Sequence, residues 1–324
     1  MEDRLNECLR LALAHNVSDI HFNVTKEKVI IEMRLSDRIR RLKSNPNDLK
    51  LFRYLQYKSN IDIGNKLLPQ TGRFETYVDS KLISLRFSII NSYKISNGVL
   101  RILNAHNKLN IKNLTYDLDV YEFLKSISFN RYGLYVFSGP TGSGKTTTLY
   151  TILNSIENKK IFTLEDPIEV YSEKFVQLQI NEKQNLGYAQ GIKQLMRHDP
   201  DIIMIGEIRD EVAASMAIRS ALTGHLVLTS IHSGNCIMAI NRLIELGVNE
   251  YQLFDVLKGI SNQRLVNTIH NTKIGIYEFM DREEVIYYFK NKTSSSKFKT
   301  LQKRIESSIE NGFIYKESAK EDLY

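Results

Sequence analysis

One short glycine-rich segment constrains the fold more than any other feature of the chain. Residues 139–146 read Gly-Pro-Thr-Gly-Ser-Gly-Lys-Thr and fit the pattern G-x-x-x-x-G-K-[ST] completely. The apolar run 133–137 precedes the segment and predicts a buried strand, and a helical pattern begins at Lys145. Glycines in such a loop let backbone N–H groups surround a polyphosphate, and the N-terminus of the next helix favours its negative charge. The sequence therefore predicts a strand–loop–helix unit that binds a nucleotide.

The residues expected to hold the nucleotide are those of the loop and of the helical turn that follows it. They are Gly139, Pro140, Thr141, Gly142, Ser143, Gly144, Lys145, Thr146 and Thr147. Within this set we expect Lys145 to reach the β and γ phosphates and the Thr146 hydroxyl to ligate Mg²⁺. The alternative is a vestigial loop that keeps the pattern without binding.

From about Tyr116 onward the chain alternates short apolar runs with helical patterns. The runs are rich in β-branched residues, as buried parallel strands are, and they lie at 161–164, 202–205 and 226–230. Helical patterns cover 211–222 and 235–246. This alternation predicts an α/β fold, in which a parallel sheet carries helices on both faces.

The rest of the chain reads differently from this core. The first third predicts a smaller α+β domain over residues 1–104, with a helix at 5–15 and strands at 20–22, 29–33, 82–90 and 99–103. A polar, asparagine-rich stretch predicts a linker over 105–115, followed by the core over 116–266. Residues 267–324 form a short C-terminal extension, where we expect strands at 274–279 and 285–289 and a polar helix over 297–311.

Composition and charge exclude several classes of protein. Hydrophobic residues make up 42% and charged residues 25% of the chain, so gross disorder is excluded, and no apolar run reaches the ~18 residues of a membrane span. The charged start differs from a signal peptide, and Cys8 and Cys236 are too few for a tetracysteine metal site. We therefore expect a protein that stays in the cytosol.

The positive charge lies in the first third of the chain. Residues 1–104 hold 18 lysines and arginines against 11 acidic residues, whereas residues 105–265 hold 16 against 17. The basic run 38–43 fits a nucleic acid, an acidic lipid or an acidic partner, or it faces solvent. Aromatic residues that would stack on bases are missing from it.

Acidic residues follow two of the predicted strands, where ligands of parallel sheets bind. Glu165 ends the 161–164 run, and Glu207 follows the 202–205 run, although Gly206 stands where the usual Walker B pattern has an aspartate. Asp210 is equally well explained as a helix N-cap. His232 lies just past the 226–230 run, where a histidine can contact a phosphate, whereas an odd separation from His225 argues against a shared metal.

Four motifs together resemble the secretion-ATPase superfamily, whose members drive type II secretion, type IV pili and DNA-uptake pseudopili. They are GPTGSGKTTT, TLEDPIE, GEIRD and GHLVLTSIHS, and they occur in family order over roughly 95 residues. The segments SDIHF, PQTGRF, LRFS, VLRIL and QRLV extend the resemblance to most of the chain, which weakens after about residue 280. In its short length the chain resembles the competence pseudopilus ATPases of Gram-positive bacteria.

This resemblance implies roles for individual residues. It makes Glu207 the atypical Walker B residue, which would be the general base and bind Mg²⁺ through water. It assigns Glu165 to an acidic segment called the aspartate box. It assigns His232, and with weaker support His225, to a segment called the histidine box. It also makes Arg73, Arg86 and Arg101 cations that reach the nucleotide, although buried arginines often just pair with carboxylates.

The resemblance also implies an architecture and a function. The core would be RecA-like, the N-terminal domain PAS-like, and the protein a homo-hexamer that hydrolyses ATP with Mg²⁺ to drive pseudopilus assembly. It would be peripheral at the inner face of the cell membrane, bound through an inner-membrane platform protein. Many family members carry a tetracysteine zinc module after the QRL segment, but residues 267–324 contain no cysteine, so we expect no zinc. We also expect no direct nucleic-acid binding. Pilus retraction, conjugation or secretion, a nucleotide-gated scaffold with little turnover and a nucleic-acid translocase remain alternatives.

Overall fold

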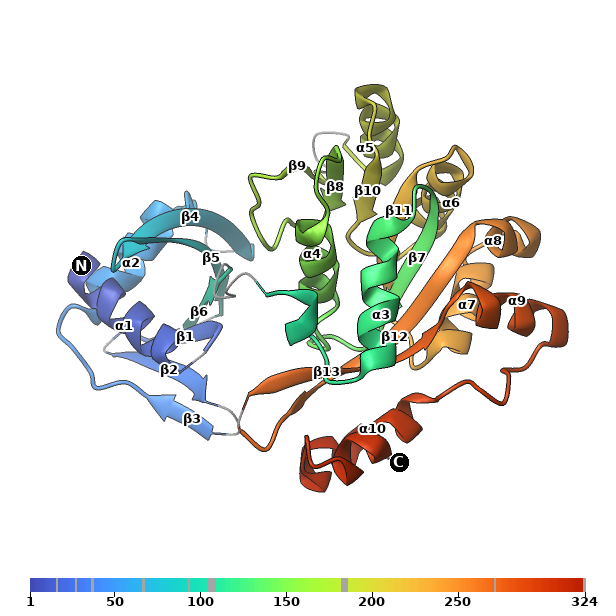
Figure 1. The fold of residues 1–324 in the computed structure, drawn as a ribbon. Helices are drawn as coiled ribbons and strands as arrows, with labels where there is room; N and C mark the ends of the chain where they lie inside the picture. Colours follow the sequence, from blue (N-terminus) through green and yellow to red (C-terminus); the bar gives the residue numbers. More distant parts are fainter. Residues whose placement is uncertain are drawn as a thin grey trace. The chain divides into compact units, whose positions relative to one another are not determined.

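The computed structural model describes residues 1–324 except 16, 27, 36–37, 66–67, 93, 104–108, 182–185, 271 and 323–324. The chain forms two compact units, Met1–Asn107 and Lys108–Tyr324 (Figure 1). Part of the expected linker, residues 105–108, lies outside the described residues. Its later part includes the short helix η1 (Ile111–Asn113), whose Ile111 packs in the second unit.

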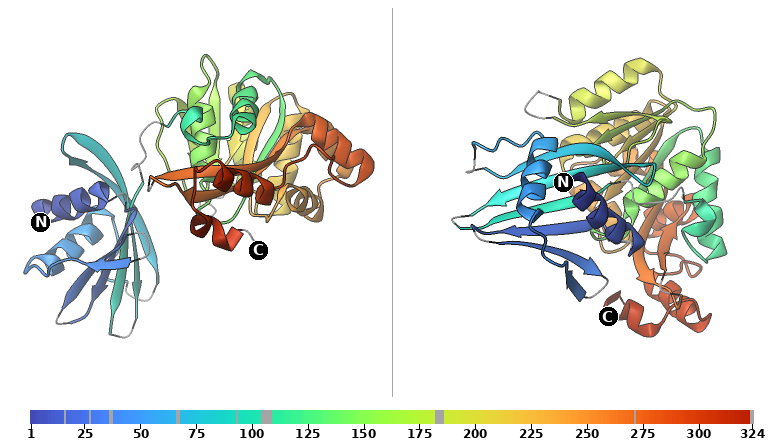
Figure 2. Two further views of the ribbon diagram at one scale, coloured as in Figure 1. Left: turned by 60° about the horizontal axis from the view of Figure 1, so that its bottom comes forward. Right: turned by 90° about the vertical axis from the view of Figure 1, so that its left-hand side faces the viewer.

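The N-terminal unit is an antiparallel sheet with two helices on one face. Its strand order is β3-β2-β1-β6-β5-β4. The strands are β1 (Asp19–Val24), β2 (Val29–Leu35), β3 (Arg38–Arg41), β4 (Gln70–Val78), β5 (Lys81–Asn91) and β6 (Ser96–Ile102). The helices α1 (Glu2–Ala14) and α2 (Asp48–Lys58) cover one face (Figure 2, left).

Alternation along the strands explains why one face of this sheet is apolar and the other polar. In β5 every second residue from Ile83 to Ile89 is buried against the helices, as period-2 patterning requires. The core centres on Phe22, Phe52 and Phe87, whose ring centroids lie 5.6–6.1 Å apart. A Cβ at Gly98 would lie 2.7 Å from two of these rings, so the close packing requires a glycine there.

The second unit contains a mostly parallel sheet of order β13-β12-β7-β11-β10-β8-β9, in which only the β12–β13 pair among those described is antiparallel. The strands are β7 (Gly133–Ser138), β8 (Ile161–Glu165), β9 (Phe175–Gln179), β10 (Ile202–Ile205), β11 (Leu226–Ile231), β12 (Leu257–Asn267) and β13 (Lys273–Met280). The α/β architecture expected from the alternating pattern is confirmed.

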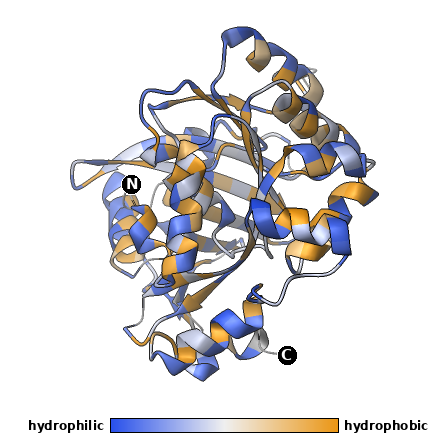
Figure 3. Ribbon diagram, turned by 45° about the vertical axis from the view of Figure 1, so that its right-hand side comes forward, coloured by the Kyte–Doolittle hydropathy of each residue, from blue (hydrophilic) through white to orange (hydrophobic). Residues whose placement is uncertain are grey.

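Helices cover both faces of this sheet, and side chains alternate between two cores. Leu134 and Val136 of β7 point toward one face, whereas Tyr135 and Phe137 point toward the other. The first face carries α5 (Tyr188–Leu195), α6 (Glu211–Leu222), α7 (Cys236–Glu245), α8 (Glu250–Val256) and α9 (Arg282–Asn291). The second carries α3 (Leu118–Ser126), η2 (Ile127–Phe129) and α4 (Lys145–Ser155). Figure 3 shows apolar residues concentrated in the central strands.

The C-terminal extension departs from expectation in one element. Residues 285–289, predicted as a strand, lie in helix α9 instead. Asp281 caps this helix by accepting from the Glu284 N–H, and Val285 and Tyr288 are buried three residues apart, so helical packing overrides the apolar run's strand preference. The other two expectations are met by β13 and by α10 (Leu301–Glu310), after which the helix η5 (Lys316–Asp322) follows.

Across the described residues, no helix combines the length and the apolar character that crossing a membrane requires.

Candidate nucleotide-binding and catalytic site

Neighbouring parallel strands bring the predicted site residues to one edge of the second sheet. Strands β7, β11, β10 and β8 are adjacent and run in the same direction, so their carboxyl ends meet. The glycine-rich loop follows β7, Glu165 ends β8, Glu207 follows β10 and His232 follows β11. This is the edge at which open parallel sheets bind ligands.

The glycine-rich loop adopts backbone conformations that glycine permits. Gly139, Gly142 and Gly144 have φ values of 143°, 81° and 88°. The Lys145 Nζ donates to the carbonyl oxygens of Gly139 at 2.8 Å and Pro140 at 3.0 Å, so the amine closes over the loop. Burial lowers the pKa of Lys145, and the nearby carboxylates of Glu207 and Glu169 oppose that shift. A cation therefore lies over the loop and beside the acid of the neighbouring strand end.

The residues of this loop fit a bound polyphosphate and a Mg²⁺ ion. The Ser143 Oγ is buried without a hydrogen-bond partner among the described residues. A Cβ at Gly139 would lie 2.6 Å from the Gln263 carbonyl oxygen, so only a glycine leaves the cradle open. Thr146 lies half-buried in the first turn of α4, and its hydroxyl and the Glu207 carboxylate are the hard oxygen donors that Mg²⁺ prefers.

The Glu207 carboxylate contacts two nitrogen-bearing side chains, those of His232 and Arg209. The His232 Nε2 lies 3.1 Å from Glu207 Oε1, and the Arg209 Nε donates to Oε2 at 3.0 Å. Arg209 also donates to Asp166 at 3.4 Å, which links the ends of β10 and β8. With 21% of its side chain exposed, Glu207 is oriented but remains accessible. The sequence predicted Glu207 and His232 separately, whereas their contact and the role of Arg209 come from the structure.

Glu165 has a different environment although it also ends a strand. Its carboxylate accepts from the Tyr150 hydroxyl at 2.7 and 2.9 Å and from the Thr163 hydroxyl at 2.6 Å, and the residue is 3% exposed. Burial raises the pKa of Glu165, and the donated hydrogen bonds, including one from Gln177, oppose the shift. The carboxylate thus joins α4, β8 and β9.

Residues of β12 connect the glycine-rich loop to the loop that carries His232. The Gln263 Nε2 donates to the Ser143 carbonyl at 2.6 Å. The Asn262 Nδ2 donates to the Ser138 Oγ at 2.8 Å and to the Ser233 carbonyl at 2.9 Å. Arg264 adds a guanidinium that donates to Asn262 and whose charge lowers the pKa of Lys145. The QRLV segment was the sequence signal for this part of the site, but it gave no role to Asn262 or Arg264.

Two further residues are placed by the structure. Asp210 caps α6 by accepting from the Ala213 N–H at 2.8 Å, which confirms the N-cap interpretation. His225 precedes β11 and contacts Thr223 and Ser220, so it lies at the opposite end of the strand from His232. It is therefore remote from the edge that carries the glycine-rich loop.

The three predicted arginines lie in one row across the N-terminal sheet. Arg73 of β4 is directly opposite Arg86 of β5, which is directly opposite Arg101 of β6. Arg101 is in turn opposite Asp19 and donates to it at 2.6 Å. The row lies on the face that α1 and α2 leave open, because its neighbours Leu85, Phe87 and Leu100 point into the core. The structure therefore brings the arginines together within their own unit.

Comparison with solved structures places this fold in a class. The structure resembles the Legionella pneumophila ATPase DotB, with a TM-score of 0.80 and 21% identity over 98% of this chain and 95% of that one. It also resembles the pilus retraction motor PilT, with a TM-score of 0.70 and 24% identity over 98% and 96% of the two chains. The fold is that of the RecA-like secretion ATPases, as the sequence resemblance implied.

A family model described as type II/IV secretion system protein matches residues 1–311. The chain is 37% identical to the competence protein ComGA of Halalkalibacterium halodurans over 82% of this chain and 78% of that one. It is 32% identical to ComGA of Bacillus subtilis over 92% and 90% of the two chains. It is 33% identical to type II secretion system protein E of Pseudomonas aeruginosa over 82% of this chain, but it spans only 54% of that protein. The chain belongs to the type II/IV secretion system protein family, which confirms the resemblance.

Proposed function

We propose that the chain is a Mg²⁺-dependent ATPase that works as a ring of identical subunits to power assembly of a competence pseudopilus for DNA uptake. One observation carries the enzymatic part of the proposal. Glu207 is oriented by His232 and Arg209 at a strand end beside the glycine-rich loop, which is the arrangement that hydrolysis requires in addition to binding. A scaffold that only binds ATP does not require an oriented carboxylate beside the glycine-rich loop.

The residues of the site divide the work of hydrolysis. Loop N–H groups and Lys145 bind the phosphates, and the amine is already buried, so turning toward a phosphate costs little further desolvation. Mg²⁺ held by Thr146, and through water by Glu207, would neutralise developing charge on the phosphates. Glu207 accepts a proton from the attacking water, and His232 lies where it can contact the departing phosphate. Glu165 acts by joining α4, β8 and β9, which stabilises the packing of this edge of the sheet.

Steady-state phosphate release from ATP and Mg²⁺ tests this proposal. We expect the Lys145→Ala variant to lose tight nucleotide binding and turnover together, because the amine contacts phosphate in both states. Lys160→Ala is the matched control, since that amine is exposed and paired with Asp199. Wild-type protein that binds ATP without releasing phosphate would favour the scaffold instead.

The row of arginines supports the proposal that the N-terminal unit completes the site, in its own or in a neighbouring subunit. The register places the three guanidinium-bearing residues directly opposite one another on one face of the sheet, and such a group of cations would attract an anion. An arginine delivered to the γ-phosphate contributes about 10³ to 10⁵ in rate. Hydrolysis would then depend on movement between units, which is how a ring converts hydrolysis into work.

Substitution of the central arginine tests this part separately. We expect Arg86→Gln to lower turnover about 10³-fold while nucleotide affinity changes far less. Arg10→Gln is the control, because Arg10 forms an exposed ion pair with Asp79. Activity per subunit of the wild-type protein should rise with its concentration as rings form. Unchanged turnover in Arg86→Gln would contradict the arginine assignment, and concentration-independent turnover by a monomer would contradict the ring.

The cellular role rests on the two ComGA relatives, which match this chain over most of their length. We propose a cytoplasmic protein that reaches the inner face of the cell membrane through a platform protein of the pseudopilus machine. In cells that carry this chain, Lys145→Ala should abolish DNA uptake, whereas Lys160→Ala should not. Normal DNA uptake with lost pilus retraction or secretion would favour those alternatives.

A further inference from the structure

A buried carboxylate on β13 joins the starts of two helices. Glu278 is 3% exposed, and each of its oxygens accepts a backbone N–H from a different helix. Oε1 accepts from Cys236 at 2.7 Å, and Oε2 accepts from Leu301 at 2.9 Å. One side chain thus connects α7, next to the proposed catalytic edge, with α10 in the C-terminal extension.

Both N–H groups occupy the same position in their helices. Cys236 is the first residue of α7 and Leu301 the first residue of α10. The N-cap side chains of Asn235 and Thr300 accept from the third residue of each helix, which leaves the first N–H to Glu278. A carboxylate between two helix N-termini is also favoured by both helix dipoles. The contact therefore fixes where each helix begins.

Helix α7 begins four residues after His232. The intervening segment is held on its other side by β12, because Asn262 donates to the Ser233 carbonyl at 2.9 Å and Arg264 donates to the Gly234 carbonyl at 3.4 Å. Glu278 lies directly opposite Asn262 in the β12–β13 ladder. The position of the loop that presents His232 to Glu207 is thus set at one end by β11 and at the other by Glu278.

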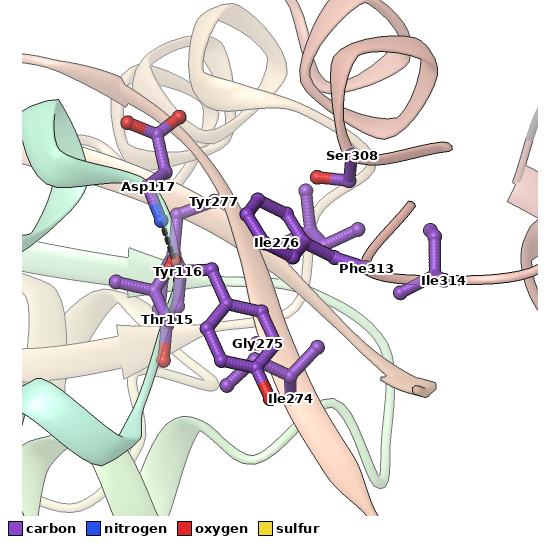
Figure 4. A pocket seen from close by; sticks show the side chains of 10 residues that line it. All are labelled: Thr115, Tyr116, Asp117, Ile274, Gly275, Ile276, Tyr277, Ser308, Phe313 and Ile314. Atoms are coloured by element: carbon purple, nitrogen blue, oxygen red, sulfur yellow. Dashed lines mark hydrogen bonds between the residues drawn. The ribbon is translucent and has the colours of Figure 1, made fainter. Parts of the chain in front are cut away.

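Helix α10 is held within the second unit by further contacts besides the one to Glu278. The Arg304 guanidinium pairs with Asp117 and lies 4.6 Å over the Phe279 ring. Tyr116 and Phe313 lie next to each other, with ring centroids 4.7 Å apart (Figure 4). The hollow between these segments has a volume of about 10 Å³, which is room for about one water molecule. The extension is thus closely packed, so a movement of α10 would also move the Leu301 N–H that contacts Glu278.

We propose that Glu278 is a positioning residue through which α10 holds the His232 loop, so that displacement of α10 lowers ATP turnover. The effect on turnover rests on the proposed function, whereas the mechanical link between α10 and the loop does not. A partner or a neighbouring subunit that lifts α10 would then slow the site without touching it.

A pair of substitutions at Leu301 isolates the link. Leu301→Pro removes the N–H that donates to Glu278, at a first helical position where proline is well tolerated. Leu301→Ala removes the same leucine side chain but keeps the N–H. We expect the backbone amide hydrogens of residues 232–240 to exchange with solvent faster in Leu301→Pro than in Leu301→Ala. We also expect the kcat of Leu301→Pro to be about 5- to 10-fold lower than that of Leu301→Ala, at similar KM. Equal amide exchange in the two variants would overturn the proposal.

A second comparison separates positioning from general stability. Glu278→Gln can accept at one end only, so it loses one of the two contacts, and its kcat should fall about 10-fold. Glu284→Gln is the control, because that carboxylate also accepts a backbone N–H from a distant segment, at Ser295, but does not reach the His232 loop. In a His232→Ala background the Glu278→Gln loss should largely disappear, since both changes act on one contact.

Full additivity of the two losses, or an equal loss in Glu284→Gln, would overturn the positioning role. If the wild-type protein hydrolyses no ATP, the proposed function fails, and the amide-exchange comparison at Leu301 still decides whether the link exists.

Discussion

Strands β8 and β10 lie side by side and each leads into a glutamate, yet the two carboxylates have opposite surroundings. Glu165 is enclosed by the neutral donors of Tyr150, Thr163 and Gln177. Glu207 is partly exposed and contacts the guanidinium group of Arg209 and the imidazole ring of His232. The comparison shows that a position at the end of a strand brings a glutamate to the site. The hydrogen-bond donors around each carboxylate then determine whether it is buried in the packing or accessible for reaction.

The difference follows from how far each acid extends beyond the sheet. In the β8–β10 ladder Leu164 is opposite Ile205, so Glu165 is still within the sheet, where α4 and β9 cover it. Gly206 adds one residue before Glu207 and carries it past the last strand pair. Glu165 therefore stabilises the packing of the site, and Glu207 faces the reaction.

Among changes to these two glutamates and their donors, the largest effect should come from Glu207. We expect Glu207→Gln to lower kcat by about 10²-fold or more, because the amide cannot accept the proton of the attacking water. Glu211→Gln, an exposed change in the first turn of α6, is the matched control and should leave kcat unchanged. Steady-state phosphate release measures both, and near-normal turnover in Glu207→Gln would transfer the role to Glu165.

A smaller effect on turnover should follow from removing a donor around Glu165. We expect Tyr150→Phe to lower the free energy of unfolding by about 1–3 kcal/mol, since a buried carboxylate loses a hydrogen bond. Its kcat should stay within about threefold of wild type, because Glu207 and His232 are untouched. Urea unfolding and phosphate release on the same sample measure the two quantities. A loss of turnover without a loss of stability would make Glu165 a reacting group.

The smallest effect is a pH dependence of stability that belongs to Glu165. Because burial raises the pKa of this carboxyl, folding favours its protonated form, and stability falls as the pH rises from the ordinary glutamate pKa through the raised one. Glu165→Gln stays neutral, so it should gain stability relative to wild type across that window, by at most about 1.4 kcal/mol per pH unit. Unfolding midpoints measured between pH 4 and 8 test this, and a constant difference would contradict it.

Much of this edge of the sheet could be predicted from the sequence because its signals are local. The glycine-rich loop, the strand before it and helix α6 depend on spacing within a few residues. The same local patterns failed at 285–289, where an apolar run fits a strand or a buried helix equally well, and they gave no sign of α2.

Contacts between distant segments could not be predicted. Arg209 is only two residues from Glu207 in the sequence, but its second partner, Asp166, is 43 residues away. The contact between Asn262 and Ser138 spans 124 residues. Predicting the arginine row also requires the pairing register of β4, β5 and β6. A shift of one residue in that register would move an arginine to the other face of the sheet. Glu278 had no sequence signal, since its two partners are backbone N–H groups.

The fate of ATP bound to the two glutamine variants tests the central contrast most directly. Protein in excess is mixed with labelled ATP and Mg²⁺, quenched at intervals, and the ratio of ADP to ATP is measured. We predict that Glu207→Gln retains intact ATP long after wild-type protein has converted it, whereas Glu165→Gln converts it at a rate within about tenfold of wild type. Rapid conversion by Glu207→Gln together with retained ATP in Glu165→Gln would contradict the account.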